Sequence, residues 1–124
     1  MTDSISDFLT RIRNANFLKK KKVFVSSTKI NLSLVKIFLR HGFLKDFKQV
    51  KNKKILCFLK YKKNKPIILQ LKRLSKPGCR LYVKKSNIPK IFGGIIFLST
   101  SKGILSDREA FRLNVGGEIL GFIS

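Results

Sequence analysis

A short run of small hydroxyl side chains is the segment of this chain best suited to close contact with a partner. Ser99, Thr100 and Ser101 are followed by Lys102 and Gly103. Each hydroxyl donates or accepts a hydrogen bond, and the glycine lets the backbone approach because it has no Cβ. Such a loop suits the wide, shallow minor groove of an RNA helix. The same residues are typical of an ordinary turn, and composition leaves both interpretations open.

The rest of the chain is dominated by positive charge. Its 124 residues include 28 Lys and Arg and only six Asp and Glu, for a formal net charge of +22. Self-repulsion at this level destabilises a fold unless a polyanion relieves it, and nucleic acid is the commonest such partner. An anionic membrane surface is the rival. No segment reaches the ~18 apolar residues of a membrane span, and no signal-peptide pattern is visible. A membrane-surface module would need a helix with a strong apolar face and a lysine-rich opposite face. The predicted helix at 29–41 comes closest, but it has only three basic residues and its apolar side is needed by the core.

The charge is unevenly spread. Residues 11–85 hold 24 basic residues and one acid, Asp46, whereas residues 86–124 hold four basic and three acidic residues. We expect the basic part to hold phosphates, which gives affinity with little sequence information, and the nearly neutral part to make close contacts through hydroxyls and backbone N–H groups. The lysine run at residues 19–22 fits phosphate contact or plain solvation equally well.

Catalytic and metal-binding patterns are absent from the sequence. It has one His, no GxSxG and no paired carboxylates in an apolar setting. His41 is expected in the last turn of a helix, where a cation is favoured. Cys57 and Cys79 lack CxxC spacing and are interpreted as two reduced thiols. We therefore expect no enzyme activity, no small-molecule substrate, no cofactor and no metal.

Hydrophobic periodicity predicts an α-β-α-β-β lobe over residues 1–65. Apolar residues recur at helical spacing in residues 3–16, where Asp3 or Ser4 is a suitable N-cap, and in residues 29–41, which Ser26, Ser27 or Thr28 can cap and Gly42 can end. Strands are expected at 23–25, 43–50 and 55–61. Residues 62–65 and Pro66 interrupt the apolar pattern, so the lobe boundary is placed there.

Residues 66–124 are predicted to form a second, mainly β lobe with short helices, making the whole an α+β fold of two small α/β lobes. Strands are expected at 67–74, 80–84, 95–98 and 118–123, with a turn at 76–78, a brief helix from Asn87 to Gly94 and another starting at Asp107, capped by Ser106. Because alternate strand residues share a face, Ser99 and Ser101 are predicted to point the same way and Thr100 the other way. Tyr82 either joins the core or offers its ring to a base or ribose, with Arg80 on the same face.

Several long motifs resemble those of the ribosomal small-subunit protein eight family, in its bacterial and plastid form. They lie at residues 7–15, 42–43, 73–82, 88–94, 99–110 and 114–120, and so follow the family's order along essentially the whole chain. Two departures are Cys79, where the family usually has a larger aliphatic residue, and the end at residues 121–124, where an aromatic residue is common. Neither departure touches the hydroxyl loop.

The resemblance implies two α/β lobes and a structural role in the small ribosomal subunit. It implies primary binding to a helical junction in the central domain of small-subunit rRNA, beside neighbouring small-subunit proteins, in support of subunit assembly and translation. An RNA-binding translational regulator acting off the ribosome is the alternative. The expected RNA-binding residues are Ser99, Thr100, Ser101, Lys102, Gly103, Tyr82, Arg80, Lys84, Ser26, Ser27, Lys29, Arg11, Arg13, Lys20, Lys21 and Glu118.

The amino-acid usage adds a hint about the source. Lys outnumbers Arg three to one, and Phe, Ile and Asn are frequent. These residues have AT-rich codons, which favours an organellar genome. Together with the resemblance, this predicts a plastid (chloroplast) ribosome as the location, with the bacterial cytoplasm or the mitochondrion as alternatives.

Overall fold

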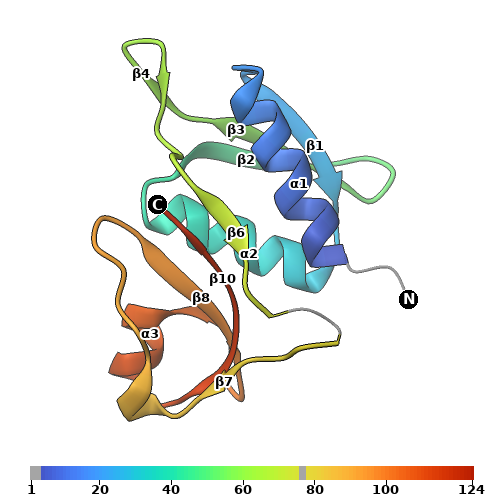
Figure 1. Ribbon diagram of the computed structural model, residues 1–124. Coiled ribbons are helices and arrows are strands. Elements are labelled where there is room, and N and C mark those ends of the chain that lie inside the picture. The colour runs from blue at the N-terminus through green and yellow to red at the C-terminus, as the bar shows by residue number, and fades with distance from the viewer. Residues whose placement is uncertain (1–3, 76–77) are drawn as a thin grey trace. The chain divides into compact units, whose positions relative to one another are not determined.

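The computed structural model describes residues 4–75 and 78–124 and has the mixed α+β fold expected from the sequence (Figure 1). The chain divides into two compact units, unit 1 ending at Leu69 and unit 2 running from Gln70 to Ser124. Each unit has its own antiparallel sheet. The division therefore falls slightly after the break in the apolar pattern at residues 62–66.

Unit 1 has the predicted α-β-α-β-β order, with an additional small hairpin at its end. Its elements are α1 (Ser4–Phe17), β1 (Lys22–Ser26), α2 (Lys29–Arg40), β2 (Leu44–Val50), β3 (Lys54–Leu59), β4 (Tyr61–Lys62) and β5 (Lys65–Pro66). The sheet has the order β1-β3-β2, and α1 lies alongside β1 (Figure 1). Phe8 of α1 and Phe38 of α2 are fully buried, with ring centroids 5.9 Å apart. This contact joins the apolar stripes of the two helices in one core.

The helix ends of unit 1 follow from local chemistry. Thr28 is the N-cap of α2, and its side chain accepts a hydrogen bond from the Asn31 N–H at 3.1 Å. His41 is the C-cap, and Gly42 follows it with a φ of +80°, a conformation that favours glycine. The cap predicted at Asp3 lies outside the described residues.

The interruption predicted at residues 62–65 is a tight turn. Tyr61–Lys62 and Lys65–Pro66 pair as the β4–β5 hairpin. Lys63 and Asn64 at its tip have φ values of +52° and +64°. Positive φ at both central residues is typical of the turns that match strand twist, and Asn tolerates it well. The loss of apolar pattern there reflects an exposed hairpin.

Unit 2 is built around one sheet. Its elements are β6 (Leu71–Arg73), β7 (Tyr82–Val83), the 3-10 turn η1 (Lys85–Asn87), β8 (Ile95–Thr100), β9 (Gly103–Ser106), α3 (Asp107–Arg112) and β10 (Gly117–Ile123). The strand order is β6-β10-β8-β9, and β7 also pairs with β10. A buried cluster of Ile96, Leu98, Ala110 and Ile119 joins α3 to β8 and β10.

The start of α3 confirms the predicted cap. The Ser106 N–H donates to Oε1 of Glu109 at 3.0 Å, and the Glu109 N–H donates to Oγ of Ser106 at 3.2 Å. Two free N–H groups of the first turn are satisfied reciprocally in this capping box. A helix of only six residues depends on such an N-terminal cap, because it has few internal hydrogen bonds.

Two predictions for unit 2 were wrong. The brief helix expected from Asn87 to Gly94 is only the 3-10 turn η1, because Ile88 precedes Pro89 and is extended, with φ −67° and ψ 118°. The strand β9 was missed, and the hydroxyl run predicted as a loop instead contributes Ser99 and Thr100 to the end of β8 and Ser101 to the tip of the β8–β9 hairpin. The turn predicted at 76–78 falls partly on residues 76 and 77, outside the described residues.

Candidate nucleic-acid interface

Three separate segments of predicted site residues meet on one face of the unit 2 sheet. In the register of β10 with its two neighbours, Glu118 lies opposite Tyr82 of β7 and opposite Ser99 of β8. Directly opposed residues on paired antiparallel strands share a face. The fold therefore brings together side chains from residues 82, 99 and 118, which are far apart in the sequence.

The close approach of these strands depends on Gly117. A Cβ at this residue would lie 2.1 Å from the carbonyl oxygen of Ser99 and 3.1 Å from Cα of Thr100. Gly117 is paired with Val83 on one side and with Thr100 on the other. Only glycine lets β10 lie this close to the end of β8, so Gly117 sets the position of Ser99.

The hairpin tip is held by Thr100. Its Oγ1 accepts from the Lys102 N–H at 3.1 Å and donates to the Gly103 carbonyl at 2.8 Å. Gly103 has a φ of +106°, which strains any other residue. Ser101, Lys102 and Gly103 are exposed at the tip. Thr100 thus uses its hydroxyl to shape the turn, while Ser101 and Lys102 face solvent.

The predicted alternation of Ser99, Thr100 and Ser101 applies only in part. Strand β8 ends at Thr100, and Ser101 lies in the turn. Strand alternation therefore assigns Ser99 and Thr100 to opposite faces but does not fix the direction of Ser101. The common orientation of Ser99 and Ser101 stays a prediction.

Tyr82 belongs to the surface and not to the core. Its side chain is 67% exposed. The backbone around it is anchored, since the Leu81 N–H donates to Oγ of buried Ser75 at 2.9 Å and the Ile119 N–H donates to the Leu81 carbonyl at 2.8 Å. The Tyr82 side chain and then Glu118 raise the pKa of the Arg80 guanidinium above its ordinary value. Arg80 therefore stays charged beside an exposed ring, and exposed Lys84 follows on the same segment.

In unit 1 the backbone of the lysine run is well anchored. Lys19 has a φ of +56° as α1 ends, and the Lys20 N–H donates to the Ala15 carbonyl at 2.9 Å. The Leu59 N–H donates to the Lys21 carbonyl at 2.9 Å, and the Tyr61 hydroxyl donates to the Lys20 carbonyl. These bonds fix the backbone of the run, and the exposed lysine side chains extend from it towards solvent.

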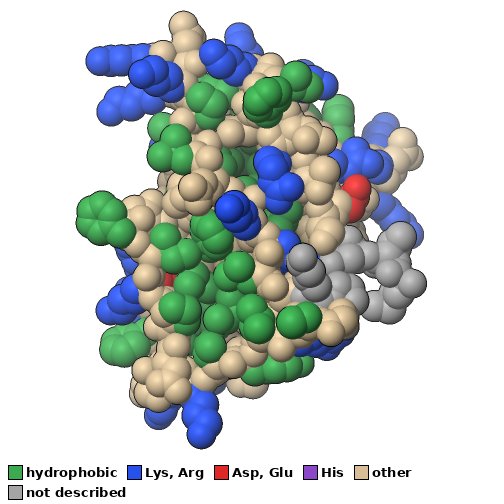
Figure 2. All heavy atoms as spheres, in the orientation of Figure 1, with side chains coloured by type: hydrophobic (Ala, Val, Ile, Leu, Met, Phe, Trp, Pro, Cys, Tyr) green, Lys and Arg blue, Asp and Glu red, His purple; other side chains and the backbone are tan. Residues whose placement is uncertain are grey.

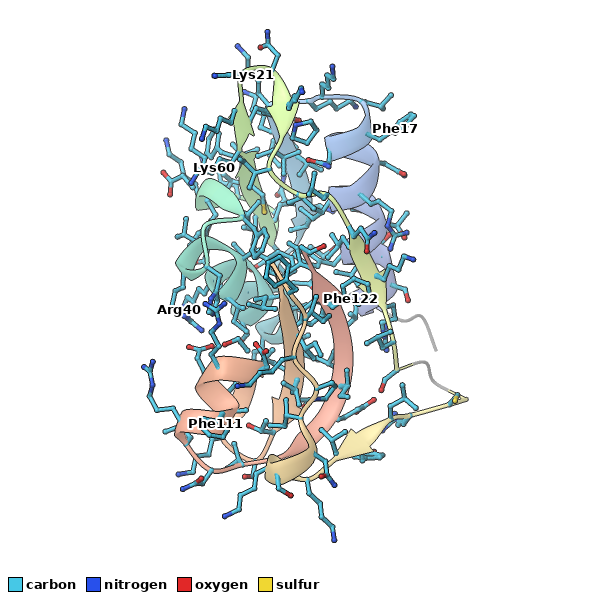
Figure 3. All side chains as sticks on the ribbon, turned by 60° about the vertical axis from the view of Figure 1, so that its left-hand side comes forward. Phe17, Lys21, Arg40, Lys60, Phe111 and Phe122 are labelled. Carbon is cyan, nitrogen blue, oxygen red and sulfur yellow. The ribbon has the colours of Figure 1, made fainter. Side chains whose placement is uncertain are left out.

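Lys21 borders a hollow of about 610 Å³ in unit 1. The side chains that line it are Lys21, Lys22, Lys45, Phe58, Leu59, Lys60 and Tyr61. In Figure 3, Lys21 and Lys60 lie at the same end of unit 1, where α1 finishes with Phe17. Figure 2 shows Lys and Arg side chains gathered over the part of unit 1 that carries β4. Sequence analysis included Lys22 in the lysine run but missed Lys45 and Lys60, because only strand pairing brings them to the same hollow.

The other predicted residues of unit 1 lie at the far end of β1. Ser26 ends this strand, and its carbonyl accepts from Nδ2 of Asn31 at 2.9 Å. The Ser27 N–H donates to the Lys53 carbonyl at 2.9 Å. Lys29 is exposed at the start of α2, whose first turn carries no acidic residue. Its charge adds to the positive end of the helix dipole, which favours an anionic partner there.

Arg11 and Arg13 are exposed on α1. Nε of Arg11 donates to Oδ2 of Asp7, four residues earlier, at 3.1 Å, and both side chains are about half exposed. Such a surface pair contributes little stability. It does offset the charge of Arg11, so Arg11 offers a phosphate less than an unpaired cation would.

The cysteines and acids form no metal site in the part of the chain that the structure describes, where no three His, Cys, Asp or Glu residues gather. Both cysteines are free thiols, Cys57 buried and Cys79 exposed. Burial raises the pKa of the Cys57 thiol from 9.0 to about 12. Among residues 4–75 and 78–124, no helix has the length and apolar character needed to cross a membrane.

Comparison with known families identifies the family of this chain. The family model described as ribosomal protein S8 matches residues 3–123. The chain belongs to the ribosomal protein S8 family. This confirms the resemblance inferred from the sequence motifs.

The relatives in this family are similar along their full length. The chain is 45% identical to small ribosomal subunit protein uS8 of Enterococcus faecalis over 129 aligned positions, which cover 99% of this chain and 98% of the relative. It is 47% identical to the protein of the same name from Acholeplasma laidlawii and 43% identical to that from Geobacillus stearothermophilus, each with 99% of this chain and 98% of the relative covered. These relatives are bacterial and lend no specific support to a plastid source.

Proposed function

We propose that this chain is a structural constituent of the small ribosomal subunit and a primary binder of the central domain of its rRNA. Membership of the ribosomal protein S8 family supports the subunit, and the face formed by Tyr82, Ser99 and Glu118 supports RNA contact. In this proposal the protein supports subunit assembly and translation, lies beside neighbouring small-subunit proteins and has no catalytic role.

The single observation that carries the proposal is the register that unites the predicted residues of unit 2. Ser99 shares a face with the exposed ring of Tyr82, with Glu118 on the strand between them, and the tip residues Ser101 and Lys102 are exposed at the end of the same hairpin. Small hydroxyls suit a shallow minor groove, where they exchange hydrogen bonds with 2′-hydroxyls and base edges. The ring of Tyr82 is available to stack on a base or ribose.

Unit 1 has a different part in the proposed complex. Lys20, Lys21 and Lys29 lie on exposed parts of this unit. Lysines that neutralise phosphates release counterions, so they add affinity that depends on salt and carries little sequence information. Unit 1 would supply much of the attraction, and the face of unit 2 would supply the discrimination.

Co-sedimentation tests the proposal. The chain is tagged at one end and expressed in bacterial cells, since its relatives are bacterial. After a wash in high salt, we expect it in the small-subunit fraction at one copy per subunit. Mass spectrometry of the fraction measures the ratio. A chain found mainly free or on messenger RNA, with no fixed ratio to the subunit, would instead indicate a regulator acting off the ribosome.

The location within the cell is proposed at two levels. A ribosome is supported by the family, and the bacterial relatives are compatible with the bacterial cytoplasm. The prevalence of Lys, Phe, Ile and Asn supports a plastid ribosome. Mapping the coding sequence to an organellar or a bacterial genome decides between them.

A further inference from the structure

One face of the unit 1 sheet is left uncovered by the helices. On β3, Ile55, Cys57 and Leu59 are nearly or fully buried, whereas the alternating Leu56 and Phe58 are only partly buried. The register places these two beside residues of β1 and β2 that share their face. We call this surface the open face, and its residues are Lys22, Phe24, Ser26, Asp46, Lys48, Val50, Lys54, Leu56 and Phe58.

Aromatic rings and lysines alternate on the open face. Phe24 is 51% exposed and lies opposite Leu56, which in turn lies opposite Lys48. Phe58 lies opposite Lys22, and Nζ of Lys48 is 5.9 Å from the centroid of its ring. Since Phe24 and Phe58 are diagonal neighbours on adjacent strands, their Cα atoms are about 7–8 Å apart. The two rings can therefore serve two neighbouring groups of one partner.

The charge of the open face is almost entirely positive. Asp46 is its only acidic residue, and Oδ1 of Asp46 accepts from the backbone N–H of Phe47 at 2.8 Å. Lys22 and Phe58 also line the lysine hollow described above, with Lys21, Lys45 and Lys60 on its other walls. The open face thus continues directly into the lysine hollow. A partner that matches both the rings and the lysines is an anion with flat groups that can stack.

We infer that the open face binds single-stranded RNA, with unpaired bases stacked on Phe24 and Phe58 and the backbone phosphates held by the lysines of the face and hollow. Stacking platforms flanked by cations are how proteins hold unpaired nucleotides, because every base has a π-face. This inference rests on the proposed RNA-binding function and adds a second class of RNA element to it. The face of unit 2 that carries Tyr82, Ser99 and Glu118 would bind an RNA helix, and the open face of unit 1 would bind an unpaired RNA strand.

The probe is a labelled oligouridylate of about eight nucleotides, the size of one single-strand site. Fluorescence anisotropy measures its affinity for the full chain. Replacing an aromatic stacking partner by Ala costs a factor of roughly 5–150 in affinity per base. We expect that loss for Phe24→Ala, with an unchanged salt dependence because no charge is removed. Phe58→Ala should weaken binding in the same way.

Three further variants isolate the stacking. Phe24→Tyr should keep the affinity of the parent chain, since the π-face remains. Phe24→Leu should lose nearly as much affinity as Phe24→Ala, because a leucine keeps apolar area but has no ring. Phe92→Ala, at a fully exposed phenylalanine of unit 2, is the matched control and should bind like the parent. Melting curves of all variants verify that they are folded.

Photocrosslinking of the same oligouridylate should place uridine on Phe24 or Phe58. Unchanged binding by folded Phe24→Ala overturns the inference, and so does full binding by Phe24→Leu, which would show that the aromatic ring is not needed to hold the RNA. A chain that binds neither oligouridylate nor a central-domain rRNA fragment defeats the proposed function as well. If the rRNA fragment binds and oligouridylate is insensitive to Phe24, only the open-face inference fails.

Discussion

Unit 1 and unit 2 are both small α+β units, but they present different chemistry. Unit 1 has 18 Lys and Arg against three acids, whereas unit 2 has ten against three. Unit 1 combines a lysine cluster on an anchored backbone with exposed Phe24 and half-buried Phe58 on its open face. Unit 2 offers a row of an aromatic, an acidic and a hydroxyl side chain, Tyr82, Glu118 and Ser99, which strand register brings together. This difference supports the proposal that unit 1 supplies electrostatic attraction to RNA and that unit 2 supplies the contacts that discriminate between RNAs.

The largest expected effect on RNA affinity comes from removing the serine hydroxyls that we propose to contact the RNA groove. Ser99→Ala together with Ser101→Ala deletes two hydroxyls and little volume, so unfolding free energy should change by well under ~1 kcal/mol. Each hydrogen bond lost in a desolvated interface costs about 1–3 kcal/mol. Binding to a central-domain rRNA fragment should therefore weaken roughly thirty- to ten-thousandfold. Titration and thermal melting on the same sample measure both, and a sharp fall in melting temperature with intact affinity would make this segment a structural turn only.

The next effect concerns the strand spacing that places Ser99. Gly117→Ala puts a Cβ 2.1 Å from the Ser99 carbonyl oxygen, so the backbones of β8 and β10 must separate. Overpacking of this kind costs about 3 kcal/mol or less. Denaturant unfolding measures the loss. Gly78→Ala is the matched control, because a Cβ there meets no atom within 4 Å, and equal stability of the two variants would contradict the account.

A smaller effect is expected at Thr100. Thr100→Val keeps the shape of the side chain but removes the two hydrogen bonds that hold the hairpin tip. Loss of these exposed bonds should cost about 1 kcal/mol of stability. Thr100→Ser retains the hydroxyl and should recover most of it. If Thr100→Val melts like the parent and only loses RNA affinity, then Thr100 acts in recognition and not in shaping the turn.

The smallest effect is a difference in reactivity between the two thiols, which is measured without substituting any residue. Alkylation at neutral pH should modify exposed Cys79 of unit 2 quickly and buried Cys57 of unit 1 only on unfolding. Because burial raises the pKa of Cys57 from 9.0 to about 12, its contribution to stability is present below pH 9.0 and is lost as the pH rises toward 12. Mass spectrometry follows both sites. Rapid native labelling of Cys57 would show that the unit 1 core opens readily.

Local signals in the sequence predicted much of this fold. The apolar stripes of α1 and α2, the capping box at Ser106 and the order of unit 1 are confirmed, because each depends on neighbouring residues. The missed strand β9 and the false helix after Asn87 show the limit of such signals. Pro89 forced an extended residue where apolar spacing favoured a helix, and β9 forms only because it pairs with β8.

The site was predictable in composition but not in assembly. Sequence analysis named Tyr82, Ser99 and Glu118, but only the register of β7, β10 and β8 puts them on one face. It left Tyr82 open between the core and contact with a base or ribose, and the ring is exposed. The open face with Phe24 and Phe58 was missed, because its pattern emerges only when β1, β3 and β2 are aligned.

The division of labour between the two units is tested most directly by the salt dependence of binding in two variants. Neutralising Lys20 and Lys21 to Gln should lower the slope of log affinity against log salt by roughly one to two and leave discrimination between cognate and scrambled RNA intact. The Ser99→Ala and Ser101→Ala double variant should lose discrimination at an unchanged slope. The account is contradicted if the lysine variant loses discrimination between RNAs, or if the serine variant shows a smaller salt slope. Either result would mean that electrostatic affinity and discrimination are not divided between unit 1 and unit 2.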